Sequence, residues 1–342
     1  MKIRFLSVLF MAVFATTFAT ECIAAYKKEY KMSVVVGPKL PWGQGAIDFA
    51  NLVRERTDGR INIKVYTSSS LMAGKQTNEF LLHRRGVADF CLASPINWST
   101  TIKPLNLFSL PFFFPDYAAL DAVVEGEVGK EIIEILKKKG VTVLAWGENG
   151  FRAITNSKQP IKTPEDMKGM KIRVVGTPIF IDTMTALGAN PVNMNWGDAQ
   201  VAFQQKVVDG QENPIVTIEI PVKIWQFHKY ITVWHYAIDP LMFTVNNDVF
   251  ASFTAEDQEI VRQAAIEAGL KQKNIVRTGL ITPDLSAIEL LKENGMVVEI
   301  LDAKTREEFK KKTQGVYEKW TDIIGADLVK KAEAAVQGSK IH

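Results

Sequence analysis

The stretch from Gly147 to Pro214 decides the fold and contains the runs RAITN at 152–156, PEDMKGMKIRV at 164–174 and VDGQENP at 208–214. Arg152 and Arg173 lie in segments whose alternating pattern is typical of β-strands. An arginine on a strand has a fixed base, and its planar fork can hold a carboxylate through two parallel hydrogen bonds. The stretch therefore predicts two strand-borne cations that can recognise a small anion.

Helix signals separate these strands. Thr163 is placed to cap a short helix that starts at Pro164, and Asp166 can complete a capping box. A second helix is expected over 178–187, and a third over about 196–207. Strands and helices that alternate at this spacing are typical of a parallel α/β layer, in which ligands bind at the carboxyl ends of the strands.

The first 25 residues have the composition of an export signal. A positively charged start is followed by an apolar run over 5–18, and Ala24 and Ala25 offer a cleavage point. The apolar run is too short to span a bilayer comfortably, so an uncleaved membrane anchor is the less favoured alternative. We expect the signal peptide to be removed and the mature chain, beginning at Ala25 or Tyr26, to lie in the periplasm.

The composition is that of a folded, water-soluble protein with 342 residues, of which 47% are hydrophobic, enough for two cores. The net charge is +3, and removal of Lys2, Arg4 and Glu21 with the signal takes one positive charge from it. So weak a charge argues against nucleic acid or a membrane surface as partner. Cys22 leaves with the signal, so Cys91 has no disulfide partner and its apolar surroundings indicate an inert thiol.

Strand and helix signals continue on both sides of the central stretch. In the first part of the chain, the segments 37–45 and 94–99 each follow a predicted strand and are candidate ligand loops. Near the other end, Thr254 is placed to cap a long helix. The sequence leaves open whether Pro283 kinks this helix or separates two helices.

Motifs of common enzymes are absent from the sequence. There is no Gly-x-Ser-x-Gly elbow, no His-Glu-x-x-His pair and no glycine-rich phosphate loop. The four histidines are scattered without the spacing of metal ligands. An exported α/β protein with strand-borne arginines and none of these motifs is expected to be a receptor for a small anion, with no catalytic residues, cofactor or metal.

The runs quoted above, together with ALGANP at 186–191, resemble the DctP-type solute receptors of tripartite ATP-independent periplasmic (TRAP) transporters. The resemblance implies two α/β lobes that close on a ligand in the cleft between them, with a long helix spanning both. One lobe would comprise 26–150 plus 239–278, and the other 151–238 plus 279–342. It also implies a monomeric receptor that binds a small organic acid and delivers it to a permease with small and large membrane subunits.

The resemblance also assigns roles to individual residues. Arg173 corresponds to the arginine that pairs with the substrate carboxylate, Arg152 to a second cationic contact, and Asn213 to an amide donor for the same group. Trp196 occupies an aromatic position that packs on the ligand. Further candidates in the first lobe are Ser94, Asn97, Trp98, Trp42, Lys39 and Gln44. Sialic-acid receptors of this family carry an acidic residue and an arginine where Ser94 and Asn97 stand, so we expect a different ligand.

The ligand expected is a monocarboxylate with an apolar or aromatic body, such as a 2-oxo or 2-hydroxy acid, in preference to a dicarboxylate or sugar acid. The candidate aromatic lining behind this expectation is Trp42, Trp98, Phe151 and Trp196. Two other classes remain open: a sensor module for a membrane signalling partner, and, less favoured, a secreted enzyme that uses the same cleft. A cation that bridges the carboxylate, for example at Glu212, also remains open.

Overall fold

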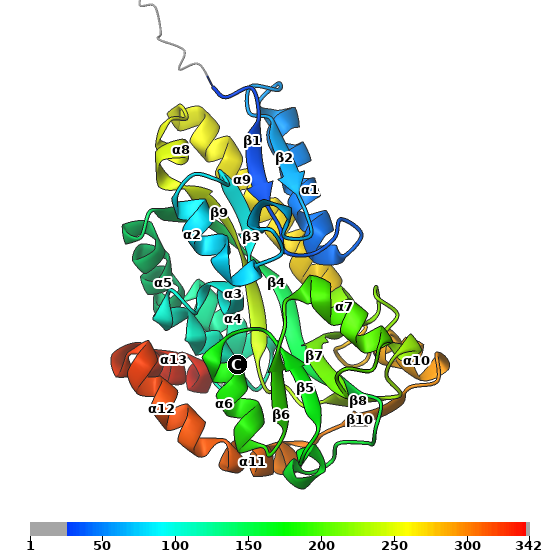
Figure 1. Ribbon diagram of the computed structural model, residues 1–342. Coiled ribbons are helices and arrows are strands. Elements are labelled where there is room, and N and C mark those ends of the chain that lie inside the picture. Colours follow the sequence, from blue (N-terminus) through cyan, green and yellow to red (C-terminus); the bar gives the residue numbers. More distant parts are fainter. Residues whose placement is uncertain (1–25, 340–342) are drawn as a thin grey trace, which may run out of the picture.

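The computed structural model describes residues 26–339, so the export signal predicted over 1–25 lies outside the described residues. In the described part, two sheets share one long strand, β4 (Val141–Asn156), near the middle of the molecule (Figure 1). No helix between residues 26 and 339 combines the length and the apolar character needed to cross a membrane.

The first sheet has the strand order β2-β1-β3-β9-β4. β1 (Tyr30–Ser33) runs parallel to β2 (Ile63–Tyr66) and to β3 (Phe90–Ala93), whereas β9 (Ile238–Asn246) runs antiparallel to β3 and β4. The carboxyl ends of β1 and β3 therefore meet at the same edge, where ligand-binding loops are expected.

The second sheet is built on the other half of β4, with which β7 (Gly210–Pro214) and β8 (Tyr230–Val233) pair antiparallel. β5 (Lys171–Val174) lies parallel between β7 and β6 (Asn190–Asn193). β10 (Val297–Ile300) runs parallel to β8. This arrangement places the strand that carries Arg173 beside the strand that ends in Asn213 and Pro214.

Strand β4 changes partners between Phe151 and Arg152. Residues 141–151 pair with β9, and residues 152–156 pair with β7 and β8. The sequence predicted a strand around Arg152, and the structure shows that this strand begins at Val141 and comprises 16 residues. The change of partners supports the proposed division into lobes near residue 150, which stays a prediction.

The helices flank both sheets (Figure 1). The α-helices are α1 (Pro41–Arg56), α2 (Glu79–Arg84), α3 (Pro95–Trp98), α4 (Tyr117–Glu125), α5 (Glu127–Lys138), α6 (Pro178–Ala186), α7 (Trp196–Gln204), α8 (Asn247–Ala251), α9 (Ala255–Arg277), α10 (Ser286–Glu293), α11 (Ala303–Lys312), α12 (Gln314–Ile324) and α13 (Ala326–Gly338). After Pro214 come a π-helix over Ile215–Glu219 and a short 3-10 helix over Ile224–Gln226.

The longest helix, α9, packs on both α1 and β4. Its start was predicted correctly, because the Thr254 hydroxyl accepts a hydrogen bond from the Asp257 amide at 3.1 Å. A side chain at Gly269 would collide with the carbonyl oxygen of Trp146, so glycine allows the helix to approach the strand closely. The helix ends at Arg277 and α10 begins at Ser286, so Pro283 lies between two separate helices.

Two clusters of buried hydrophobic side chains support this framework. One includes Phe49, Phe90 and Phe243 around the first sheet. The other includes Phe108 and Trp234, and the Trp234 indole donates a hydrogen bond to the Arg152 carbonyl at 3.1 Å. A core side chain therefore fixes the backbone that carries Arg152.

Candidate functional site

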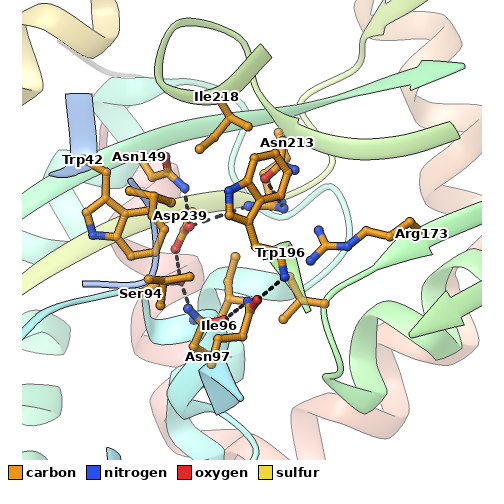
Figure 2. A pocket seen from close by; sticks show the side chains of 15 residues that line it. Trp42, Ser94, Ile96, Asn97, Asn149, Arg173, Trp196, Asn213, Ile218 and Asp239 are labelled. Atoms are coloured by element: carbon orange, nitrogen blue, oxygen red, sulfur yellow. Dashed lines mark hydrogen bonds and ion pairs between the residues drawn. The ribbon is translucent and has the colours of Figure 1, made fainter. Parts of the chain in front are cut away.

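A small cavity lies where the two sheets meet, and its walls come from both of the predicted lobes (Figure 2). Its volume is about 20 Å³, room for roughly one water molecule. The lining residues are Val35, Val36, Trp42, Gln76, Ser94, Ile96, Asn97, Asn149, Arg152, Arg173, Val175, Trp196, Asn213, Ile218 and Asp239. The cavity therefore brings together most of the residues predicted for the site.

Arg173, on β5, is a buried cation without a carboxylate partner. Only 1% of it is exposed, and its Nε and Nη2 donate to the Met194 carbonyl at 3.0 and 2.8 Å. No ion pair within residues 26–339 includes it. Burial lowers its pKa to about 10, so the guanidinium stays charged at neutral pH. A buried charge with no counterion is unfavourable, and an anionic ligand would relieve that cost.

Arg152, on β4, differs from Arg173 because its charge is already paired. Its guanidinium forms an ion pair with the buried Glu212 carboxylate, and Nη2 donates to Glu212 Oε1 and Asn213 Oδ1 at 2.9 Å each. Burial alone would lower its pKa, but Glu212 raises the pKa of Arg152 above its ordinary value. A ligand carboxylate therefore gains less charge compensation from Arg152 than from Arg173.

The pairing follows from the register of β4 and β7. Arg152 lies opposite Pro214, and Ile154 lies opposite Glu212. Residues two apart share a face of a sheet, so Arg152 and Glu212 are diagonal neighbours on one face. The Tyr236 hydroxyl also donates to Glu212 Oε2 at 2.6 Å. These contacts occupy the Glu212 carboxylate, and within residues 26–339 no three His, Cys, Asp or Glu side chains are grouped so that they could hold a metal ion.

Asn213 lies beside the two arginines on the cavity wall. Its Oδ1 accepts from Arg152, and its Nδ2 donates to Gln211. An amide nitrogen has two donor hydrogens, so one remains for a ligand oxygen. Trp196 packs nearby, with Arg173 Cζ at 5.8 Å from its ring centroid.

The facing wall contains a buried acid, Asp239, at the start of β9. Its carboxylate accepts hydrogen bonds from Ser94 Oγ at 2.6 Å and from Asn149 Nδ2 at 2.7 Å (Figure 2). Arg152 Nη1 lies 3.6 Å from Asp239 Oδ2. Burial raises the pKa of Asp239 to about 6. This side chain is therefore largely ionised at neutral pH and faces the cavity opposite Arg173.

Gln76 connects the two walls. Its Nε2 donates to Asn97 Oδ1 at 2.7 Å, and its Oε1 accepts from the Trp196 backbone amide at 2.7 Å. Gln76 and Asn97 belong to the first predicted lobe, whereas Trp196 begins α7 in the second. The bond between Gln76 and Trp196 is therefore a clasp across the cleft that requires the two walls to be close together.

Lys39 and Gln44 lie elsewhere, in a separate surface cavity of about 180 Å³ along α1 and α9. The segment 37–45 was predicted as a loop, but the structure corrects this, because α1 begins with Pro41 at its first position. On this helix Trp42 faces inward, and its indole donates to the Leu92 carbonyl at 2.9 Å. Gln44 instead lies on the exposed face of α1, where its Nε2 donates a hydrogen bond to Asp48 Oδ1 at 3.0 Å.

Trp98 and Phe151 also lie outside the lining of the central cavity. Trp98 is fully buried in the core, and Phe151 stacks on His235 with ring centroids 4.3 Å apart. The aromatic lining is thus reduced to Trp42 and Trp196. Aliphatic side chains that the sequence did not single out complete it: Val35, Val36, Ile96, Val175 and Ile218. The apolar part of the cavity therefore has fewer aromatic and more aliphatic side chains than the sequence predicted.

Trp98 has a structural partner in the buried acid Glu79. The Trp98 indole donates to Glu79 Oε2 at 3.1 Å, and the Ser33 hydroxyl donates to Oε1 at 2.9 Å. Burial raises the pKa of Glu79 from 4.5 to about 8. Between these values the folded protein keeps a proton that the unfolded chain has lost, so this group makes the free energy of unfolding fall as pH rises.

We expect Glu79→Gln to remove this pH dependence. Between pH 6 and 8 the wild type should lose up to about 1.4 kcal/mol of unfolding free energy per pH unit more than the variant, because glutamine cannot ionise. Denaturant titrations at several pH values measure the slope. Glu134→Gln, at an exposed helical position, is the matched control and should keep the wild-type slope. Equal slopes for wild type and Glu79→Gln would contradict the assignment.

Sequence reasoning missed three polar residues that line the cavity: Gln76, Asn149 and Asp239. A partial signal exists for Asn149, which lies inside the quoted stretch three residues before Arg152. Asp239 precedes Pro240 at the start of a strand, and nothing in its local sequence distinguishes it from a strand-capping acid. No histidine or cysteine is among the lining residues, which lie within the described part of the chain.

A family model and several curated proteins match this chain. The family model described as bacterial extracellular solute-binding protein, family 7, matches residues 32–322. The 2,3-diketo-L-gulonate-binding periplasmic protein of Escherichia coli is 32% identical over 257 residues, which are 75% of this chain and 76% of that protein. The C4-dicarboxylate-binding periplasmic protein of Rhodobacter capsulatus is 29% identical, over 89% of this chain and 90% of that protein.

Solved structures share the fold. A TRAP periplasmic solute-binding protein from Ralstonia eutropha, with bound (S)-2-hydroxy-2-methyl-3-oxobutanoate ((S)-2-acetolactate), has a TM-score of 0.90 and is 51% identical. The match covers 92% of this chain and 100% of that one. A sugar acid binding protein from Advenella mimigardefordensis in complex with galactonate has a TM-score of 0.84 at 26% identity, over 92% and 99% of the two chains. These matches confirm the predicted two-lobe α/β fold.

Proposed function

Since the chain belongs to family 7 of the bacterial extracellular solute-binding proteins, we propose that it is the TRAP receptor for a compact 2-hydroxy or 2-oxo monocarboxylate. The receptor captures the acid in its cleft and presents it, as a monomer, to the small and large membrane subunits of a permease. The predicted receptor for an organic acid is confirmed at the level of the family, whose members bind such acids. The identity of the ligand, delivery to the permease and the monomeric state are proposals.

The observation that carries the proposal is the unpaired guanidinium of Arg173. The other arginine of the site, Arg152, forms an ion pair with Glu212. Arg173 instead donates hydrogen bonds only to the Met194 carbonyl. A monocarboxylate supplies one negative charge and two acceptor oxygens, which match the fork of this guanidinium.

The apolar lining supports a small, branched body for the ligand. Five aliphatic side chains and two indoles line the cavity beside its polar groups, so ligand hydroxyl groups that face this apolar part would be left unpaired. The Ralstonia eutropha relative, 51% identical, holds a branched five-carbon hydroxy acid. Its ligand has a single carboxylate and a compact branched body, in which a hydroxyl and a keto group stand beside two methyl groups.

Binding without chemical conversion is the proposed outcome. Nucleophilic catalysis needs a nucleophile with an adjacent base, and the Ser94 hydroxyl on the cavity wall donates to Asp239 without a histidine among the lining residues. The clasp between Gln76 and the Trp196 amide instead favours a receptor whose lobes open for entry and close on the ligand. Closure of this kind is a population shift that the ligand drives.

The proposed location is the periplasm. The relatives from Escherichia coli and Rhodobacter capsulatus are named periplasmic proteins. We also propose that the signal peptide predicted over 1–25 is removed during export. Sequencing the N-terminus of the exported protein tests it, and a chain that keeps Met1 in the membrane fraction would contradict it.

A thermal-shift screen followed by titration calorimetry tests the proposed ligand class. The purified protein is mixed with (S)-2-acetolactate, 2-oxo-3-methylbutanoate, malate and galactonate. A ligand at a thousand times its dissociation constant adds roughly 4 kcal/mol to the free energy of unfolding, and we expect the largest shift with the first two acids. Recovery of the acid unchanged separates a receptor from an enzyme. Larger shifts with malate or galactonate would overturn the proposed ligand class.

A further inference from the structure

The central cavity has two poles of opposite charge. Arg173 lies on one wall, and Asp239 lies on the other, only 1% exposed. Carboxylate recognition by Arg173 gives no role to this acid, although the two residues line the same small cavity (Figure 2). An ionised carboxylate in a ligand cavity acts on the ligand through its charge and its acceptor oxygens.

The protein does not saturate Asp239. Ser94 Oγ and Asn149 Nδ2 each donate one hydrogen bond to it, at 2.6 and 2.7 Å. A carboxylate offers about four lone-pair sites, so acceptor capacity remains for a ligand. Its nearest cation, Arg152, is 3.6 Å away and is already paired with Glu212. The negative charge of Asp239 is therefore only partly compensated.

We propose that Asp239 is the specificity-determining residue of this cavity: its carboxylate accepts a hydrogen bond from a hydroxyl group of the ligand and repels a second ligand carboxylate. The inference rests on the function proposed above, in which Arg173 holds the first carboxylate. Because Arg173 and Asp239 line the same cavity, a compact acid held by Arg173 also reaches the opposite wall.

Two general effects make this arrangement selective. A buried group that hydrogen-bonds a ligand hydroxyl discriminates strongly against the analogue without it, because the protein group is then left unpaired. A like charge placed against the wrong ligand is the repulsive element that specificity often needs. Asp239 supplies both effects from one side chain, and so separates hydroxy monocarboxylates from plain acids and from dicarboxylates.

Three matched acids isolate the two effects. 2-Hydroxy-2-methylbutanoate is the reference, 2-methylbutanoate lacks its hydroxyl, and 2-hydroxy-2-methylbutanedioate carries a second carboxylate in place of the terminal methyl group. Their affinities are measured at pH 8 by competition against (S)-2-acetolactate in a calorimeter. The wild type should prefer the reference acid by roughly thirtyfold or more over each of the other two.

Asp239→Asn keeps the size of the side chain and removes its charge. We expect both preferences to shrink at least tenfold, which is about 1.4 kcal/mol each. Asp322→Asn, at an exposed position on α12, is the matched control and should keep the wild-type preferences. If Asp239 only positioned Ser94 and Asn149, its replacement would weaken the binding of all three acids alike. An equal loss of affinity for the three acids would therefore overturn the proposal.

The ligand series on the wild type provides a second test that does not depend on the folding of the variant. If the wild type binds 2-methylbutanoate or the dicarboxylate as tightly as the reference acid, the proposal for Asp239 is wrong while the receptor function stands. If the wild type binds no carboxylate at all, the proposed function itself is wrong, and the inference is overturned with it.

Discussion

Arg173→Ala should all but abolish binding of a micromolar acid while the protein remains folded. A closed cleft removes the ligand carboxylate from water, and Arg173 is the buried cation of the cavity that no carboxylate of the described chain compensates. Loss of one partner from a buried ion pair costs roughly 3–5 kcal/mol, which is about two to three and a half decades in the dissociation constant. Titration calorimetry of the purified variant measures the loss.

Arg173→Lys should fail to restore binding. The ammonium group of lysine is a compact, strongly hydrated charge that cannot meet both carboxylate oxygens with a planar fork. Arg54→Ala, at an exposed position of α1, is the matched control and should bind as the wild type does. If Arg173→Ala bound within about fivefold of the wild type, less than roughly 1 kcal/mol, Arg173 would not anchor the carboxylate.

The stability of the ligand-free Arg173→Ala variant separates loss of binding from loss of fold. In the wild type the guanidinium is buried without a counterion, and burial lowers its pKa to about 10. Its removal relieves a desolvation cost and gives up the hydrogen bonds to the Met194 carbonyl and the contact with the Trp196 ring. We therefore expect the ligand-free variant to unfold at no lower denaturant concentration than the wild type.

The sequence predicted those parts of the fold and site that depend on local patterns. The capping box at Thr163 forms as expected, because the Asp166 carboxylate accepts from the Thr163 amide at 2.8 Å. The strand that carries Arg173 also forms where the alternation placed it. These features depend on residues within a few positions of one another, so the sequence contains the information that specifies them.

Features that depend on where two distant segments meet could not be predicted in this way. Asp239 reaches the cavity because β9 pairs with both β3 and β4, and its hydrogen bonds to Ser94 and Asn149 join residues from three strands or their ends. The position at which a helix begins also determines where two candidate residues lie. The start of α1 at Pro41 directs Trp42 into the cavity and Gln44 to the exposed face.

The role of Arg152 shows the same limit. Its sequence context resembles that of a ligand-binding cation, but the register of β4 against β7 places Glu212 on the same face. The resulting ion pair is buried on both sides, with 3% of the arginine side chain and none of the glutamate side chain exposed. Charge compensation thus distinguishes the two arginines, and only the paired positions of distant strands determine it.

Glu212→Ala should destabilise the fold, in contrast to Arg173→Ala. The substitution leaves Arg152 buried beside Asp239 alone, whose Oδ2 is 3.6 Å from Nη1, and deprives the Tyr236 hydroxyl of its acceptor. Breaking a buried pair in this way costs roughly 3–5 kcal/mol of unfolding free energy. Denaturant unfolding followed by circular dichroism measures it, and Glu289→Ala, from an exposed pair with Lys292, should cost no more than about 1 kcal/mol.

The double variant Arg152→Met/Glu212→Leu tests the reason for this loss. If the cost comes from an uncompensated charge, replacing both partners by apolar side chains of similar size should recover most of the stability that Glu212→Ala loses. The difference from the sum of the single variants is then the coupling energy of the pair. If Glu212→Ala were no less stable than Glu289→Ala, Glu212 would not be the counterion of Arg152, and both arginines would be free to bind the ligand carboxylate.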